Sequence, residues 1–245
     1  MVNNYYNKIA WDYHLKRKKP WKALEDFFNC LKEKKYNFPG YCIDLGCGSG
    51  RNFTIFKESD NKLIGIDNSI EFLKIAKSNL NDVNQYSKFD ADNIQLILGD
   101  INYSPIKAKA VNNVFSIASI HHIKGKEERQ EVILKLHDLM KENAFLLLTV
   151  WRRWQKKFKK YFIIDKLKRL FNPKYKIHQK KLDLSEFGDK HVPWTISKKD
   201  RTYNRFYHFF TKKEMKNVLK TYKIREFKKS GGPTNKDNFF ILAQK

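Results

Sequence analysis

The sequence predicts an α/β fold in which a seven-stranded, mostly parallel sheet carries helices on both faces. Short apolar runs typical of buried strands alternate with segments of helical period, and a glycine-rich turn follows the first run. Strands are expected at 41–45, 63–66, 94–98, 110–118, 144–151, 223–228 and 238–243. Helices are expected at 21–31, after a cap at Ser69, at 127–141 and near 211–222. In such a sheet the ligand lies beyond the carboxyl ends of the strands.

The 245 residues fit one domain, because no repeat or Gly/Ser/Pro linker divides them. Segment 152–205 interrupts the alternation, and we expect it to form a basic insertion over the top of the sheet. No apolar run reaches the roughly 18 residues of a membrane span, and the N-terminus lacks a signal-peptide pattern. We therefore expect an intracellular, cytoplasmic protein with no membrane partner.

The three cysteines predict neither a disulfide framework nor a metal site. Cys30, Cys42 and Cys47 are odd in number and lack the spacing of metal ligands. No metal ion is expected.

The charge of the chain points to a polyanionic partner. Fifty Lys and Arg against 26 Asp and Glu give a formal net charge of +24, and such an excess favours phosphate contacts. Residues 152–181 hold many of these basic residues, with one acid, Asp165, and interleaved aromatic residues. This composition is typical of a site for single-stranded or looped RNA. Two alternatives are aromatics that anchor helices and a helix on a membrane surface, the second disfavoured by lysines that break the apolar face.

An acid, a glycine-rich turn and acids at later strand ends together indicate a cofactor site. The turn reads Asp44-Leu-Gly-Cys-Gly-Ser-Gly50, and Asp67 ends the next strand. Glycines let the backbone turn sharply close to a ligand, and the second acid is placed to accept hydrogen bonds from ribose hydroxyls. The G-x-G-x-G spacing suits a ligand with a cationic amino end and no phosphate, unlike the G-x-G-x-x-G turn of dinucleotide folds.

This pattern resembles the first motif of class I (Rossmann-like) methyltransferases, which implies S-adenosylmethionine as the cofactor. By that resemblance Asp44 and the turn hold the methionine end, Asp67 holds the ribose, and the end of the third strand lies near the adenine. The residues expected to bind the cofactor are Asp44, Gly46, Cys47, Gly48, Gly50, Asp67, Asn68, Asp100 and Ile101. Cys47 is interpreted as a small filler of the turn rather than a nucleophile.

The candidate acceptor residues are basic and hydrogen-bonding. Methyl transfer from a sulfonium is an in-line displacement, so a base is needed only for a protonated acceptor. The fourth strand runs into His121 and His122 without the N/D-P-P-Y motif of amine methyltransferases, and no catalytic-cysteine context is present. With Arg17 and Arg129 these histidines suit a carboxylate, which guanidinium groups grip bidentately and which is ionised at neutral pH. The structural alternatives are a packed His122 and a solvated Arg129 on an exposed helix turn.

Beyond the cofactor turn, the chain carries five motifs in order. They are Arg17-Lys-Lys-Pro-Trp21, Ser116-Ile-Ala-Ser-Ile-His-His122 with Glu128-Arg129, Val192-Pro-Trp194, Arg205-Phe-Tyr-His-Phe209 with Glu214, and 237–245. Together they resemble the tRNA wobble-uridine carboxymethyl methyltransferases, which include the methyltransferase domain fused to an AlkB-like dioxygenase in animals. Two departures are Asn68, where the family has a basic residue, and the 152–205 insertion, which does not match the family's variable linker.

The resemblance implies a tRNA methyltransferase that forms the methyl ester of 5-carboxymethyluridine at the wobble position. Arg17, His121 or His122, and Arg129 would bind the base or its carboxylate, and Tyr207 and His208 would line the same pocket. Trp194 is either a stacking platform or part of the core. The family also implies a heterodimer with a small zinc-binding activator protein. The alternatives are a class I methyltransferase for another RNA or carboxylate acceptor, and a catalytically silent RNA-binding relative.

Overall fold

A computed structural model describes residues 5–58, 60–82, 93–100, 106–197 and 201–245. Its helices are α1 (Tyr5–Lys16), α2 (Lys22–Glu33), α3 (Phe53–Phe56), α4 (Ile70–Asn81), α6 (Lys126–Leu139), α7 (Lys159–Phe171), α8 (Pro173–Lys181) and α9 (Lys212–Val218), with a 3₁₀ turn, η2, at Ile120–His122. Its strands are β1 (Gly40–Leu45), β2 (Asn61–Asp67), β3 (Ile94–Leu98), β4 (Val111–Ile117), β5 (Met140–Trp151), β6 (Asp189–Thr195), β7 (Thr202–His208), β8 (Lys223–Ser230) and β9 (Asn238–Gln244). In the described part of the chain, no helix combines the length and the apolar character that a membrane crossing requires.

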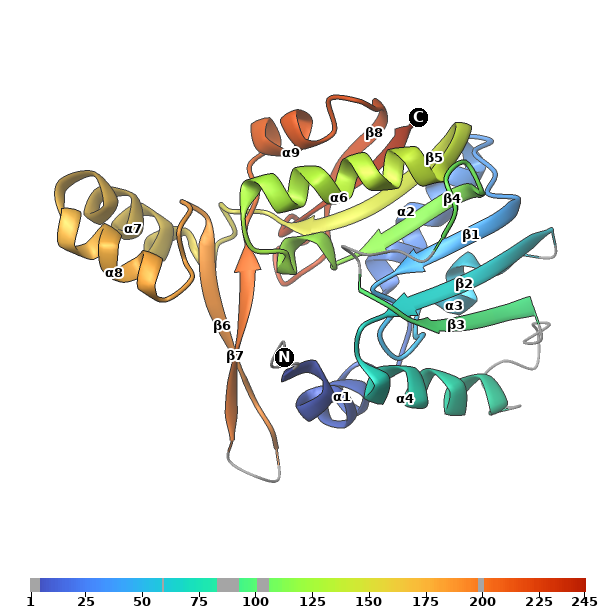
Figure 1. The fold of residues 1–245 in the computed structure, drawn as a ribbon, viewed down its shortest axis with the longest axis horizontal. Coiled ribbons are helices and arrows are strands. Elements are labelled where there is room, and N and C mark those ends of the chain that lie inside the picture. The colour runs from blue at the N-terminus through green and yellow to red at the C-terminus, as the bar shows by residue number, and fades with distance from the viewer. Residues whose placement is uncertain (1–4, 59, 83–92, 101–105, 198–200) are drawn as a thin grey trace.

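Seven strands form one sheet in the order β3-β2-β1-β4-β5-β9-β8 (Figure 1). The pairs from β3 to β5 are parallel, and β9 runs antiparallel to both β5 and β8. This arrangement confirms the predicted seven-stranded, mostly parallel sheet. The strand order reverses between β1 and β4, and ligands of open α/β sheets bind beyond the carboxyl ends of strands at such a point.

The sheet has a separate apolar core on each face because its strand residues point alternately to opposite sides. On one face, residues such as Leu146 and Ile241 pack against α6 and α9. On the other face, residues such as Leu147 and Phe240 pack against α2, α3 and α4. Helices therefore cover both faces, as the sequence predicts.

Helix α1 forms in the polar, tyrosine-rich N-terminal region, where the sequence showed no helical period. Ala10 lies in a small cluster with Phe72 and Ile75 of α4, and Tyr6 and Tyr13 pack against that cluster. Asn7 also accepts hydrogen bonds at the start of α4, from the Ser69 hydroxyl at 2.6 Å and the Glu71 N–H at 3.3 Å. These contacts hold the helix beside the first part of the sheet.

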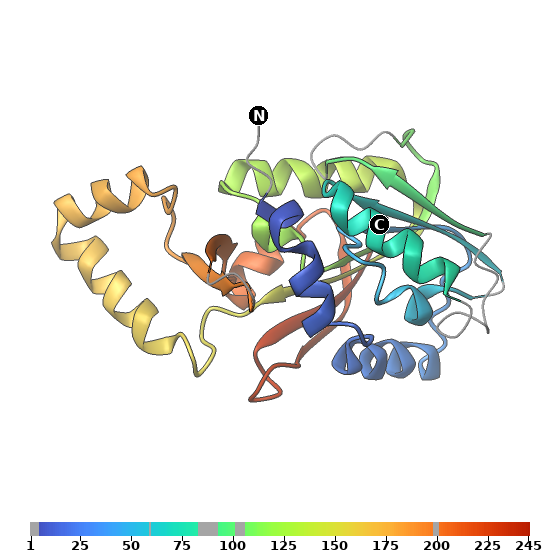
Figure 2. The same cartoon turned by 90° about the horizontal axis from the view of Figure 1, so that it is seen from below.

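The basic segment after β5 contains two helices and a β-ribbon. The β6–β7 ribbon stands across the carboxyl ends of the sheet strands, and α7 and α8 project beyond it (Figures 1 and 2). A third cluster that includes Phe162, Tyr207 and Phe209 connects α7 to the ribbon. Only the ribbon therefore lies over the top of the sheet, and β7 continues past residue 205 to His208.

Candidate active site

The glycine turn after β1 has the backbone conformation that its glycines permit. Gly46, Gly48 and Gly50 have φ values of 79°, 57° and 70°, in the left-handed region that side chains with a Cβ disfavour. A Cβ on Gly46 would lie 2.3 Å from the hydroxyl oxygen of Ser119, so the turn sits directly against the segment that follows β4. A Cβ on Gly48 would meet only one ring carbon of Phe72, at 4.0 Å. The turn therefore has close packing on one side and room at Gly48.

Asp44 is a buried carboxyl group with an unsatisfied oxygen. The residue is 1% exposed, and its Oδ1 has no hydrogen-bond partner among the described residues. Burial and the neighbouring charge of Asp67 raise the pKa of Asp44 to about 8, against a smaller opposing effect of Arg51. A buried carboxylate of this kind fits a cationic ligand, and S-adenosylmethionine carries an ammonium group at its methionine end.

Asp67 connects the turn to the start of α4. Its carboxylate accepts hydrogen bonds from the N–H of Gly48 at 2.8 Å and the N–H of Ser69 at 2.9 Å. Burial raises the pKa of Asp67, and these N–H donors partly oppose the shift. Each carboxylate oxygen can accept a further hydrogen bond, so the side chain keeps capacity for ribose hydroxyls.

The remaining predicted cofactor residues lie near the ends of the same strands. The Asn68 amide donates to Asp100 at 3.3 Å, which brings the ends of β2 and β3 together. Ile101 lies outside the described residues. Cys47 is buried, and burial raises the pKa of its thiol. Its sulfur packs beneath the turn, where it would lie 3.0 Å from a Cβ on Gly65, so only its backbone belongs to the turn's outer surface.

The two histidines that follow β4 are buried side by side in η2. The Nδ1 atom of His121 accepts from the Trp151 N–H at 3.3 Å, which places the proton of the neutral ring on Nε2, and that atom has no described partner. His122 donates from Nδ1 to the Phe206 carbonyl at 2.9 Å. Burial lowers the pKa of His121 well below its usual value and that of His122 to about 3. Both rings are therefore neutral at physiological pH.

Aromatic side chains and one arginine surround these histidines. The Tyr207 ring lies 4.9 Å from His121, 4.3 Å from His122 and 4.3 Å from Trp151. Arg205, two residues earlier on β7, lies over the rings of Trp194 at 4.7 Å and Tyr207 at 5.2 Å. We call His121, His122, Trp151, Trp194, Arg205 and Tyr207 the acceptor cluster.

Arg129 occupies a different environment from the one predicted. The sequence predicted a role in binding the acceptor, with a solvated position on an exposed helix turn as the alternative, but the residue is 2% exposed. Its guanidinium donates to Glu186 at 2.7 Å and to the Ile123 carbonyl at 3.0 Å. Arg129 is buried because residues 184–189 fold back over the start of α6. Glu186 supplies the opposite charge that burial of an arginine requires.

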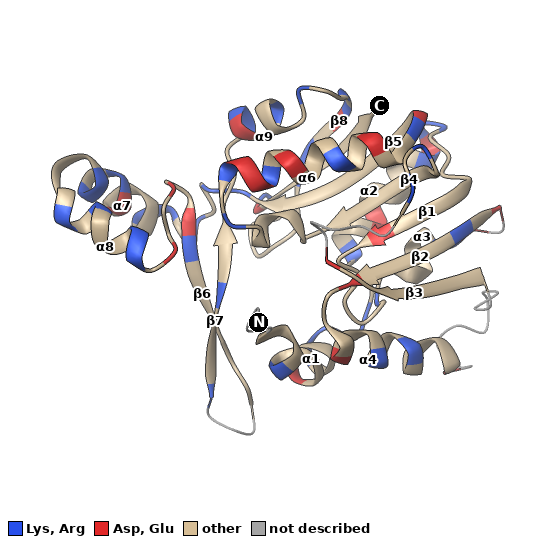
Figure 3. Ribbon diagram, in the orientation of Figure 1, with Lys and Arg blue, Asp and Glu red and all other residues tan. Residues whose placement is uncertain are grey.

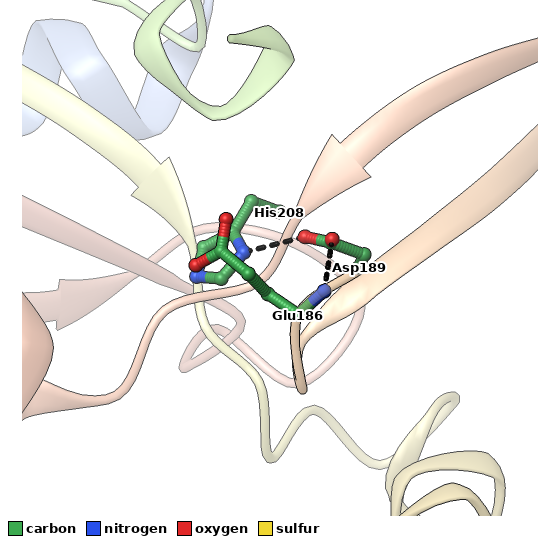
Figure 4. Close-up of side chains that lie close together, drawn as sticks. All are labelled: Glu186, Asp189 and His208. Carbon is green, nitrogen blue, oxygen red and sulfur yellow. Dashed lines mark hydrogen bonds and ion pairs between the residues drawn. The ribbon is translucent and has the colours of Figure 1, made fainter. Parts of the chain in front are cut away.

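His208 also lies away from the acceptor cluster. Its Nδ1 donates to Asp189 at 2.7 Å, and the Glu186 N–H donates to the same carboxylate at 2.8 Å (Figure 4). Burial, then the charge of Arg129, lower the pKa of His208 to about 3, and burial raises that of Asp189 to about 6. We call Arg129, Glu186, Asp189 and His208 the ion network.

The ion network has the residue types of a metal site, but most of its ligand atoms already have partners, Glu186 Oε1 being the exception. Ligand atoms of Glu186, Asp189 and His208 lie within 4.8 Å of one another. Arg129 pairs with Glu186, and His208 and a backbone N–H occupy the two oxygens of Asp189. A divalent cation would have to displace these donors beside a fixed positive charge, so the geometry supports a structural network.

The structure brings together only part of the predicted acceptor set. His121, His122 and Tyr207 are adjacent, whereas Arg129 and His208 belong to the ion network. Arg17 is exposed, and its guanidinium donates to the Lys16 carbonyl at 3.1 Å.

Arg205 was not among the site residues predicted from the sequence. Alternate residues of a strand share a face, so placing a strand at Arg205-Phe-Tyr-His208 would have grouped Arg205 with Tyr207 and separated both from His208.

Comparisons with known proteins show which proteins the chain resembles. Residues 43–148 match the family described as "Methyltransferase domain". The chain is 24% identical over 249 residues to the tRNA (carboxymethyluridine(34)-5-O)-methyltransferase of Schizosaccharomyces pombe, a match that covers 100% of this chain and 96% of that protein. Proteins of that name from Mus musculus and Saccharomyces cerevisiae are each 29% identical over 61% of this chain, which spans only 20% and 47% of their lengths.

Solved structures share the fold at low sequence identity. A methyltransferase from Methanosarcina mazei aligns with a TM-score of 0.66 and 19% identity, over 88% of this chain and 96% of its own. One from Clostridium acetobutylicum aligns with a TM-score of 0.62 and 14% identity, over 98% and 99%. The comparisons together confirm the class I fold, the enzyme class, the S-adenosylmethionine cofactor and the similarity to wobble-uridine methyltransferases.

Proposed function

We propose that this S-adenosylmethionine-dependent methyltransferase acts on tRNA and forms the methyl ester of 5-carboxymethyluridine at the wobble position. The observation that carries the proposal is the acceptor cluster, which places neutral hydrogen-bond donors and aromatic surfaces beside the cofactor turn. Ser119, just before η2, donates to the Gly46 carbonyl at 3.4 Å and so joins the two. The names of the relatives, at 24–29% identity, support the same acceptor.

The cofactor, when bound, supplies a methyl group on a sulfonium. Asp44 would hold the cationic methionine end, Asp67 the ribose, and Asn68 with Asp100 the region of the adenine. The room at Gly48 fits this arrangement, because a side chain there would occupy the cofactor's place.

The acceptor needs alignment rather than deprotonation. A carboxylate is ionised at neutral pH, so the main tasks of the site are to orient it in line with the methyl group and to exclude water. His121 has an Nε2–H that has no partner among the described residues and can donate to a carboxylate oxygen. Because the pKa values of His121 and His122 are lowered, we assign these residues to hydrogen bonding and exclude them as a proton source.

The basic insertion is the proposed contact surface for the tRNA backbone. All ten of its lysines between 156 and 181 are exposed, whereas Arg153 and Arg169 are paired with Glu214 and Asp165. Figure 3 shows these basic positions along α7 and α8. Of the interleaved aromatics, Phe158 and Phe162 belong to the local core, and Phe171 is 80% exposed and free to stack on a base.

A protein partner also belongs to the proposal. The resemblance to the wobble-uridine family implies a small zinc-binding activator, so we propose a heterodimer that acts in the cytoplasm. Co-purification of the full chain with a zinc-containing protein tests the partner directly.

The reaction is tested with labelled S-adenosylmethionine and an anticodon stem-loop RNA that carries 5-carboxymethyluridine, followed by nucleoside analysis. The expected result is a methyl ester on that nucleoside and none on the same RNA with unmodified uridine. Cofactor binding without transfer, in the presence of any co-purified partner, would contradict the proposed acceptor and favour another RNA or carboxylate. Absence of cofactor binding would favour the catalytically silent alternative.

A further inference from the structure

We infer that Arg205 is the anchor for the carboxylate of the methyl acceptor. The inference rests on the proposed function and assigns the carboxylate to a residue other than the predicted Arg17 and Arg129. It depends on how buried arginines are paired in this protein.

Three arginines are buried among the described residues, and only one has no acidic partner. Arg129 pairs with Glu186 at 2.7 Å, and Arg153 pairs with Glu214 at 2.5 Å. Arg205 is 6% exposed, and no described Asp or Glu lies within ion-pair distance of it. A guanidinium stays charged at any physiological pH, so its burial without an anion is unfavourable. A bound anion would remove this penalty.

The surroundings of Arg205 define the kind of anion. The Trp194 and Tyr207 rings stabilise the cation, but these groups are neutral. The Arg205 Nε has no described partner, and neither has the Nε2 of His121. A planar guanidinium and a ring N–H, both enclosed by aromatic rings, fit a carboxylate attached to a planar base.

The charge of Arg205 acts on the acceptor histidines rather than on the cofactor carboxyl group. The Tyr207 ring, over which Arg205 lies, is 4.9 Å from the His121 ring and 4.3 Å from the His122 ring. Burial is the main cause of the lowered pKa of both histidines, and the charge of Arg205 adds to it. The charges that shift the pKa of Asp44 come instead from Asp67 and Arg51. A carboxylate could come from the acceptor or from the methionine end of the cofactor, and this placement favours the acceptor.

The test compares Arg205→Gln with the wild-type full chain, any co-purified partner being retained. Two stem-loop RNAs are used, one with 5-carboxymethyluridine and one with the neutral amide of the same group, and their Kd values are measured with S-adenosylhomocysteine present. The wild type should bind the carboxylate form more tightly, and Arg205→Gln should lose that preference. We expect kcat/KM to fall roughly 100-fold while the Kd for S-adenosylmethionine stays within about twofold.

Two further variants keep the test decisive. Arg225→Gln removes an exposed arginine that contacts Gln244 and should match the wild type. Arg205→Lys keeps the charge and should retain part of the preference, and it replaces Arg205→Gln in the comparison if that variant does not fold.

Three outcomes separate the hypotheses. Loss of the carboxylate preference in Arg205→Gln supports the inference. An unchanged preference, or a loss confined to S-adenosylmethionine binding, overturns it, the latter because Arg205 would then hold the cofactor's own carboxylate. If the wild type binds cofactor but does not methylate the carboxymethyl RNA, the proposed function fails independently of Arg205.

Discussion

The two faces of β7 differ in whether their buried charged groups have partners of opposite charge. On one face, His208 joins the ion network, where Arg129 has a carboxylate partner and His208 donates to another. On the other face, Arg205 and Tyr207 belong to the acceptor cluster, where no acidic partner of the guanidinium is found among the described residues and its ring neighbours are neutral. Both faces are basic and buried, and both carry residues that a motif search would consider functional. The pairing of the charges, rather than residue type, separates a structural group from a ligand-binding one.

The physical reason is the cost of burying a charge. An ion network balances desolvation by internal attraction and hydrogen bonds, so it is complete without a ligand. A buried charge or donor without a partner remains unfavourable until a ligand supplies one. Asp44, with an unsatisfied oxygen beside the glycine turn, follows the same rule as Arg205.

The largest effect is expected in the ion network. Arg129→Met leaves the Glu186 carboxylate without its guanidinium, and the free energy of unfolding should fall by about 3–5 kcal/mol. The double variant Arg129→Met, Glu186→Leu removes both charges and should recover most of that loss. Urea titration of the single and double variants measures both values. A stable Arg129→Met protein that has lost only transfer would return Arg129 to the acceptor site.

The second effect concerns Asp44 and the pH dependence of cofactor binding. Its pKa is raised to about 8 without ligand, and a cationic ligand binds the ionised form. Affinity for S-adenosylmethionine should therefore rise roughly tenfold between pH 6.5 and pH 8, above which the ligand's own ammonium group begins to lose its proton, and binding at pH 7 should release a proton. Calorimetry in buffers of different ionisation enthalpy measures both quantities. Asp44→Asn should bind more weakly with little pH dependence, and an equally steep profile in that variant would exclude Asp44 as the titrating group.

The third effect is on acid stability. The pKa values of His122 and His208 are lowered to about 3 in the folded protein, against about 6.5 when unfolded. Between these values the unfolded state binds more protons, so each histidine lowers stability as pH falls, by up to about 1.4 kcal/mol per pH unit. Their contribution is fully favourable only above about pH 6.5.

Buried carboxyl groups with raised pKa values have the opposite effect on the pH dependence of stability. Asp189, at about 6, holds a proton more tightly when folded, so its contribution grows as pH falls through that value. The melting temperatures of the wild type and of His122→Asn or His208→Asn are measured as a function of pH. The difference between the two curves gives the contribution of the substituted histidine. If the difference in melting temperature stays constant between pH 4 and 7, folding does not lower the pKa of the histidine in question.

The smallest effect on stability is expected at Arg205. Arg205→Met replaces an unpaired guanidinium by an apolar side chain of similar length, so the free energy of unfolding should change by less than about 1 kcal/mol. This contrasts with Arg129→Met, the same substitution at a paired site. Thermal and urea unfolding of the two variants side by side measures the contrast. A loss at Arg205 as large as that at Arg129 would show that the aromatic contacts make Arg205 structural.

The sheet, the cofactor turn and four of the eight described α-helices, α2, α4, α6 and α9, could be predicted because their signals are local. The glycine turn and the alternation of apolar runs need only neighbouring residues, and the Ser69 cap forms its expected hydrogen bond to the Phe72 N–H. Helix α1 was missed because its stability comes from packing on α4 rather than from its own apolar period. The β6–β7 ribbon was missed because lysines and aromatic residues obscure its alternation.

The sequence by itself determined the class of fold, the glycine turn at which the cofactor is expected, and the position of the two histidines after the fourth strand. Only the tertiary structure decided which charged groups are paired. Arg129 and Glu186 lie far apart in the chain, and the fold brings them to 2.7 Å. The same Asp and Glu residues of the sequence could in principle pair with Arg205 as with Arg129. The fold instead places Arg205 among aromatic rings. Charge pairing depends on distance in space, which local residue patterns do not encode, and this is why the acceptor arginine emerges only from the fold.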